Sequence, residues 1–194
     1  EIDEHYTYMG GTSMASPIAT GAGAVLIQYF RQMCGGASPS PALLKALMIA
    51  CADDMPDDYG TDPTPNFDEG WGRIYLPNII ESDTLYLCEN QSVLLRQDET
   101  WTRNIFIRSG DEPLRITLAY TDVPGLPSVI PSLVNDLDLI VTAPDGTLYY
   151  GNQFSQGLSI PGSSPDRLNN VEGFYLEDPA PGLYRVTIRA HRIA

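Results

Sequence analysis

The sequence is poor in positive charge, and it has no long apolar run. Eleven lysines and arginines stand against 25 acidic residues, so the net charge is −14. This charge argues against nucleic acid and anionic membranes as partners, because both are polyanions. No apolar stretch approaches the roughly 20 residues needed to cross a bilayer. We therefore expect no nucleic acid and no membrane among the partners.

Cysteine is also scarce, since the chain has three, and their spacing matches no metal-binding motif. Cys34 and Cys51 each follow a stretch with a helical pattern. In an antiparallel pair of helices they would lie at opposite ends, which is too far for a disulfide. Cys88 could reach either of them or neither. We expect free, mostly buried thiols.

A turn of small residues at 10–17 runs directly into a long apolar stretch. Gly10 and Gly11 permit a tight turn, and the residues that follow favour a helix that ends near Met33. Ser13 is thus expected at a helix N-terminus, where unpaired N–H groups and the helix dipole favour a developing oxyanion. On position alone, the simpler interpretation is that Ser13 only caps the helix.

The run Gly11-Thr12-Ser13-Met14-Ala15-Ser16-Pro17 resembles the catalytic-serine motif of the subtilisin-like serine proteases. The resemblance implies that Ser13 is the nucleophile and that its own N–H is one oxyanion donor. It also implies a protein or peptide substrate, an extracellular location, and a buried helix at 18–32 that packs on a sheet.

A second helix is predicted after the loop at 35–40, with Ser40 as its N-cap and Pro41 at its first position. Residues 53–69 are rich in Asp, Pro and Gly without periodicity, which predicts a solvated acidic loop rather than a cation site. In many subtilases a glycine-rich stretch similar to 70–73 precedes the last piece of the catalytic domain. We therefore place the domain boundary shortly after Ile80.

The remainder of the chain has strand character, often with alternating apolar and polar residues. Strands are predicted at 84–88, 92–95, 100–107, 114–120, 136–141, 147–150, 173–176 and 183–190. Many short strands separated by turns and not by helices indicate an antiparallel sandwich or barrel.

This half carries a second resemblance, over the segments 133–139, 143–147, 150–152, 169–172 and 181–184. They are similar to the C-terminal jelly-roll domain of the oxidatively stable alkaline subtilases, and more distantly to the P domain of proprotein convertases. The two resemblances together imply an α+β chain. Residues 1–80 would be the C-terminal helices of an incomplete subtilisin-like α/β catalytic domain, and residues 81–194 an all-β antiparallel jelly-roll or β-sandwich domain.

Asn135, Asp136 and Asp138 are candidate calcium ligands. Alternation places both aspartates on one face of a strand, and carboxylates are preferred calcium ligands. Calcium sites are known in the family, and residues such as Asn169, Asn170 or Glu172 would complete this one. The alternative is that these polar side chains lie on the solvated face of a sandwich strand.

A serine nucleophile needs a base and an acid that orients the base. In subtilases the Asp and the His precede the Ser, and the residues before Ser13 contain neither motif. We interpret His5 and His191 as surface histidines. The first residues are neither basic nor apolar and show no signal peptide, so the chain is expected to be a C-terminal fragment, inactive alone, whose N-terminal catalytic segment is missing.

The jelly-roll resemblance also implies one further strand after Ala194. An open sheet edge and an uncovered first helix would then promote self-association. The alternative function is a β-sandwich module that binds or stabilises a partner without catalysis, in which the serine motif is vestigial.

Overall fold

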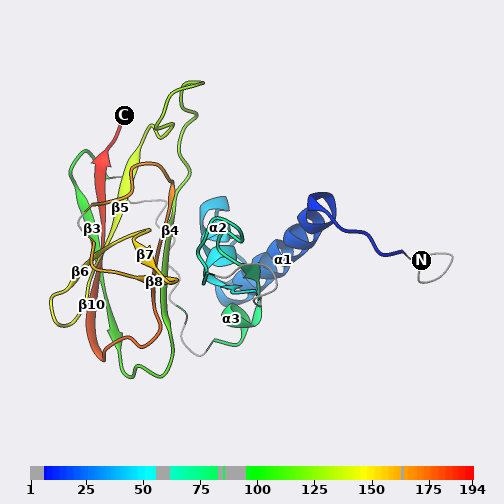
Figure 1. Ribbon diagram of the computed structural model, residues 1–194, viewed down its shortest axis with the longest axis horizontal. Helices are drawn as coiled ribbons and strands as arrows, with labels where there is room; N and C mark the ends of the chain where they lie inside the picture. The colour runs from blue at the N-terminus through cyan, green and yellow to red at the C-terminus, as the bar shows by residue number, and fades with distance from the viewer. Residues whose placement is uncertain (1–6, 56–61, 83–84, 86–94, 163) are drawn as a thin grey trace.

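The computed structural model describes residues 7–55, 62–82, 85, 95–162 and 164–194. Helices come first and antiparallel strands follow, so the predicted α+β class is confirmed. Figure 1 shows the helices gathered on one side of the molecule and the larger sheets on the other.

Helix α1 spans Thr12–Met33 and ends where the sequence predicts. Its burial does not follow the prediction, because its buried residues are Gly23, Leu26 and Phe30, whereas Ile18 is 74% exposed and Val25 43% exposed. Helix α1 packs against α2, and several of its apolar side chains, such as Met33, remain exposed. The expected buried helix is therefore largely uncovered, and the segment before it extends away from the rest of the molecule (Figure 1).

Helix α2 spans Pro41–Ala50, and the Ser40 side chain accepts a hydrogen bond from the Leu43 amide at 3.1 Å, as its N-cap role predicts. The short helix α3, Pro77–Ile80, ends at the predicted domain boundary, which stays a prediction. The helices share a core formed by Leu26, Leu47, Cys51 and Ile79. Cys51 is a free buried thiol as expected, but Cys34 is free and exposed, because it lies at the uncovered end of α1.

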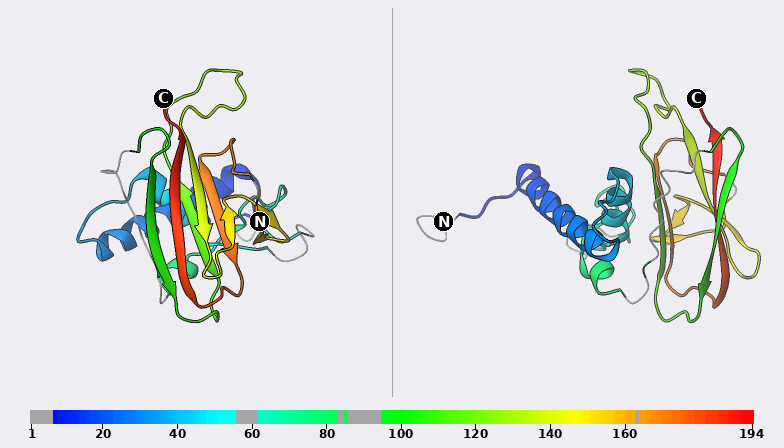
Figure 2. Two further views of the ribbon diagram at one scale, coloured as in Figure 1. Left: turned by 90° about the vertical axis from the view of Figure 1, so that its left-hand side faces the viewer. Right: turned by 180° about the vertical axis from the view of Figure 1, so that it is seen from behind.

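The strands form a two-layered antiparallel arrangement. One sheet has the order β3 (Thr100–Ile107), β10 (Gly182–Arg192), β5 (Asp136–Thr142) and β6 (Leu148–Tyr150), and β4 (Leu114–Ala119) pairs with β9 (Val171–Leu176) in the other. Figure 2 (left) shows the four-stranded sheet face on. The core between the layers contains Leu139, Val141, Phe174, Tyr184 and Val186.

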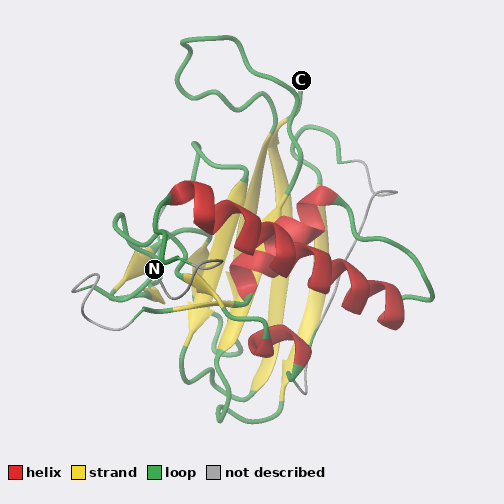
Figure 3. Cartoon of the chain, turned by 90° about the vertical axis from the view of Figure 1, so that its right-hand side faces the viewer, coloured by secondary structure: helices red, strands yellow, loops and turns green. Residues whose placement is uncertain are grey.

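The helices cover the outer face of the β4–β9 pair, with α2 against β4 (Figures 2 and 3). Trp71 packs edge-on against Phe154 and Tyr175, with ring centroids 6.2 and 6.1 Å apart. Arg115 donates to the Ala52 carbonyl at 2.6 Å, and its guanidinium lies 5.5 Å from the Tyr175 ring centroid. These contacts form the junction, our name for the Trp71, Ala52, Arg115, Phe154 and Tyr175 cluster that joins helices and strands.

Among the described residues, the six predicted strands from 100–107 to 183–190 are confirmed, with ends that differ by at most two residues. Five short elements were not predicted: the pair β1 (Ala52–Asp53) and β2 (Arg73–Ile74), the pair β7 (Phe154–Ser155) and β8 (Leu158–Ser159), and α3. Apart from Leu85 and Leu95, the strands predicted at 84–88 and 92–95 lie outside the described residues, as do Cys88 and His5.

Candidate functional site

Ser13 is the second residue of α1, and Gly11 is the N-cap. The Gly11 backbone has φ +134°, a conformation that side chains other than glycine rarely adopt, and its carbonyl accepts from the amides of Met14 and Ala15 at 3.0 and 3.1 Å. The interpretation of Ser13 as the cap is therefore wrong. Its side chain is exposed, and its hydroxyl makes no hydrogen bond within the described part of the chain.

The start of α1 retains a positive electrostatic character. No acidic side chain lies in the first turn, and the N-cap supplies no side-chain acceptor. The amide of Ser13 precedes the first intrahelical hydrogen bonds and finds no acceptor among the described residues. Pro17 lacks an N–H, so it cannot bond the Ser13 carbonyl. This end of the helix is suited to stabilise a negative charge that forms next to the Ser13 oxygen.

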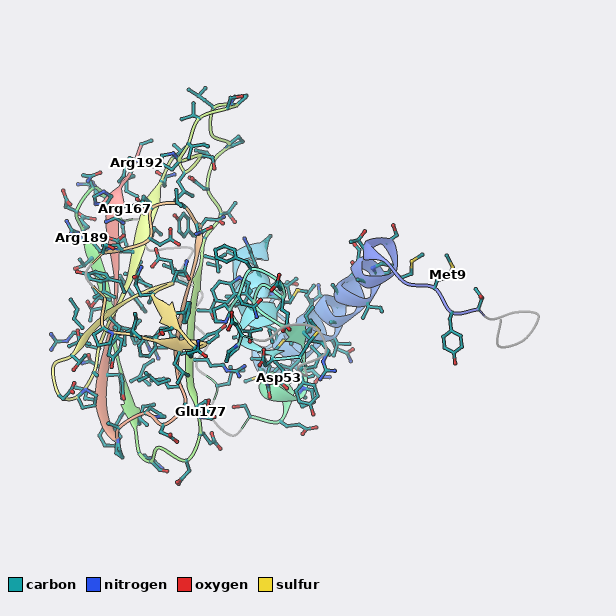
Figure 4. All side chains as sticks on the ribbon, in the orientation of Figure 1. Met9, Asp53, Arg167, Glu177, Arg189 and Arg192 are labelled. Atoms are coloured by element: carbon teal, nitrogen blue, oxygen red, sulfur yellow. The ribbon has the colours of Figure 1, made fainter. Side chains whose placement is uncertain are left out.

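The described residues bring no histidine to Ser13. His191 lies in β10 next to Arg192, at the opposite end of the molecule from Met9 (Figure 4). It is half-buried, so its interpretation as a surface histidine holds only in part. A base for the serine is therefore not supplied by the part of the chain that the structure describes.

The candidate calcium ligands lie elsewhere, on the four-stranded sheet. Asp136 and Asp138 are 1% and 0% exposed, so the alternative of a solvated strand face is wrong. Arg167 explains the burial, because its guanidinium contacts both carboxylates. Nη1 donates to Asp138 Oδ1 and lies 3.5 Å from Asp136 Oδ1, and Nη2 lies 3.4 Å from Asp138 Oδ2.

Burial and charge act in opposite directions on this group. Burial raises the pKa of Asp136, and the positive charge of Arg167 partly opposes that shift. Burial alone would lower the pKa of Arg167, but its hydrogen bond to Asp138 and the neighbouring carboxylates hold that pKa above its usual value. The arginine is therefore charged and serves as the counter-ion of the two aspartates.

Glu172 of β9 is a third buried carboxylate, 0% exposed. Its Oε2 accepts from the Leu139 amide at 2.8 Å, while Oε1 has no partner among the described residues. Burial raises the pKa of Glu172 to about 8, and the negative charges of Asp138, Asp166 and Asp136 add to the rise. Glu172 is therefore largely protonated at neutral pH.

Polar side chains fix the backbone around these carboxylates. Asp166 accepts from the side-chain amides of Asn152 and Asn169 at 2.5 and 2.7 Å and from the Leu168 amide at 2.7 Å. Burial tends to raise the pKa of Asp166, but these donors hold it below its usual value. Asn152 also bonds the Gly173 amide at 2.9 Å, so the segment before β9 is tied to that strand.

Asn135 has other partners. Its side-chain nitrogen donates to Asp122 at 2.8 Å, and its side-chain oxygen accepts from the Ala194 amide at 3.0 Å. The Asn135 backbone carbonyl accepts from the Tyr120 hydroxyl at 3.1 Å. Its oxygens are thus used by protein donors.

The residues present do not fit calcium. Calcium takes six to eight oxygen ligands in proteins, yet Asp136 and Asp138 bind a guanidinium and the oxygens of Asn135 are occupied. Within the described ranges, no group of three or more His, Cys, Asp or Glu side chains is arranged to hold a metal ion. Two of the three predicted ligands, Asp136 and Asp138, share the Arg167 guanidinium, whereas Asn135 bonds Asp122 and Ala194.

Sequence reasoning missed Arg167, Asp166 and Asp122. Arg167 lies 29 residues from Asp138, in a polar segment without periodicity, so no pattern connects the two. The available signal is compositional, since Arg167 is the basic residue that precedes the segment 169–172, which was already identified as a motif.

Comparison with known proteins agrees with the serine turn. Residues 2–72 match the model of the Subtilase family, the segment that contains Ser13 and α2. The chain is a subtilase-like protein, because residues 2–72 are similar to a family of proteases.

Two relatives match almost the whole chain. They are the Serine protease/ABC transporter B family proteins tagA and tagB of Dictyostelium discoideum, 30% and 27% identical over 93% of this chain. The chain spans only 11% and 12% of their lengths. In the described part of the chain, no helix has the length and apolar character needed to span a membrane.

Proposed function

We propose that the chain carries the nucleophile segment of a serine endopeptidase and that Ser13 is the nucleophile. The proposal rests on the position of Ser13 in the first turn of α1, inside the residues that match the Subtilase family. The Ser13 oxygen attacks the peptide carbonyl carbon while its proton passes to a base, which gives a tetrahedral oxyanion intermediate. The C–N bond of this intermediate then breaks, the base returns the proton to the departing amine, and an acyl-enzyme remains. Water hydrolyses the acyl-enzyme, which releases the acid and restores the Ser13 hydroxyl. The Ser13 amide donates to the oxyanion.

The base and its orienting acid come from outside this chain in our proposal. In a subtilisin, loss of the Ser or the His alone lowers kcat by about a millionfold. We therefore expect the 194-residue chain to be inactive by itself. The exposed face of α1 supports the same view, because Ile18 and Val25 are apolar side chains that a missing catalytic segment would cover.

We further propose that the sandwich has the jelly-roll topology of the alkaline subtilases. The substrate class is protein or peptide, and the parent protein acts outside the cell, both by family resemblance. Calcium remains a proposal for sites other than Asn135, Asp136 and Asp138.

The test is labelling with a fluorophosphonate, which reacts with an activated serine, together with the intact mass of the natural protein. A longer polypeptide should label, and Ser13→Ala should abolish the label. Ser16→Ala is the matched control, because Ser16 lies one turn further along α1 and should leave labelling intact. Labelling of the isolated chain that depends on Ser13 would refute its predicted inactivity.

A second function has one observation in its favour. The junction attaches the sandwich to the helices through Trp71 and Arg115, which suits a module that stabilises whatever packs on α1. If the natural product is this chain and it stays unlabelled, the serine motif is vestigial and this function is the better proposal.

A further inference from the structure

Two carboxylates buried side by side on one strand need a positive charge. Asp136 and Asp138 are almost completely removed from solvent, and an ionised carboxylate is costly to bury without a partner. A metal ion or a side-chain cation meets this need. These alternatives predict different responses to chelators and to mutation.

The contacts of Arg167 decide between them. Its guanidinium bonds both oxygens of Asp138, approaches Asp136, and donates to the Asp166 carbonyl at 3.0 Å. An arginine that binds a carboxylate through two nitrogens forms a strong and directional ion pair. We infer that the guanidinium of Arg167 takes the place of a metal ion at β5, so that this corner of the sandwich keeps its fold without calcium.

The backbone around Arg167 is built to hold it there. Asp166 is fixed by Asn152 and Asn169, and Asn152 is fixed in turn to Gly173 of β9. Arg167 therefore connects β5 to the segment before β9, and Asp166 and Asn152 connect that segment to Gly173 within β9. Without it, Asp136 and Asp138 would lie uncompensated near Glu172, whose Oε1 has no partner in the described structure.

This arrangement also predicts what the cluster becomes when the arginine is removed. Arg167→Gln removes the charge and leaves two buried aspartates close together. We expect Arg167→Gln to create a site for a divalent cation that the native chain lacks. Calcium is the probe, because it prefers carboxylate oxygen ligands.

The experiment measures thermal unfolding and calcium binding of the 194-residue chain and its variants. The native chain should bind no calcium at Asp138, so Asp138→Asn should leave its calcium binding unchanged. Arg167→Gln should lower Tm by roughly 10 °C, since breaking a buried pair is strongly destabilising, and millimolar calcium should recover part of the loss. Arg189→Gln is the control, because it breaks the exposed ion pair with Asp98 and should change Tm little.

Two results would overturn the inference. One is calcium binding to the native chain that Asp138→Asn removes. The other is an Arg167→Gln variant as stable as Arg189→Gln. If Arg167→Gln does not fold, Arg167→Lys serves instead, because it retains the charge but not the two-nitrogen contact and should lose part of the stability.

Discussion

At the scale of single residues, the two groups of interest are opposites in their exposure. Ser13 lies at an open helix end with its hydroxyl in solvent, whereas Glu172 is shut between the sheets. The reactivity of the exposed serine depends on the groups that contact it. A buried carboxyl owes its protonation state to the protein around it, and this can be measured in the chain alone.

Glu172 should make stability depend on pH. Its pKa of about 8 lies above the ordinary value of 4.5 that we assign to the unfolded chain. The folded state therefore binds the Glu172 proton more tightly than the unfolded chain does. The contribution of this proton to the free energy of unfolding is complete below pH 4.5 and is lost as pH rises through about 8. A rise of even one pKa unit corresponds to about 1.4 kcal/mol of stability. Urea unfolding should therefore show a free energy of unfolding that falls by at least about 1 kcal/mol between about pH 5 and about pH 9.

Glu172→Gln tests this assignment, because a neutral amide of the same shape cannot ionise. The variant should lose most of that decline. Glu177→Gln is the control, since Glu177 is exposed directly after the end of β9 (Figure 4), and this variant should retain the native pH dependence. An unchanged slope in Glu172→Gln would mean that another group titrates.

At the scale of elements, the strands were the easiest part to predict. Alternation such as Leu114 to Leu118 gives a clear period of two, and β4 follows it. The β7–β8 pair was missed because two-residue strands have no period to detect.

Alternation also correctly placed Asp136 and Asp138 on one face, but no local pattern reveals that Arg167 covers that face. Burial of α1 was overestimated because composition does not show which neighbours are present.

The junction should couple the helices to the sandwich. A side chain at Gly173 would lie 2.7 Å from the Trp71 ring, so the indole packs directly on β9. Trp71→Ala removes this contact and should cost up to about 3 kcal/mol, the low end of the range for a fully buried aromatic, because Trp71 is only half-buried. It should also separate thermal unfolding into two transitions.

Phe67→Ala is the matched control for Trp71→Ala. Phe67 lies in the same segment but is fully exposed, so its removal should leave a single transition near the native Tm. Calorimetry distinguishes the two variants. A single unshifted transition in Trp71→Ala would show that the junction does not couple the two parts.

At the scale of the whole molecule, uncovered apolar surface should cause association. Tyr8, Met9 and Ile18 are 83%, 68% and 74% exposed along one end of the molecule. Exposed apolar patches of this kind promote contacts between copies. We expect light scattering to show oligomers that dissociate on dilution.

Ile18→Lys combined with Val25→Lys should shift the chain towards monomer, because both changes place charge on the exposed face of α1 without entering its core. Leu168→Lys is a control at an exposed apolar position of the sandwich, 61% exposed. A native chain that is already monodisperse and monomeric would contradict the expectation.

The order of strands in the four-stranded sheet bears on how the protein is made. Strand β10 lies between β3 and β5, and Thr100 pairs with Arg189. During synthesis, β3 and β5 therefore leave the ribosome well before the strand that joins them. At about 5–20 residues per second, β3 waits several seconds with unsatisfied edges. Nascent chains held in this interval are the form in which the protein is most exposed to aggregation and to chaperones.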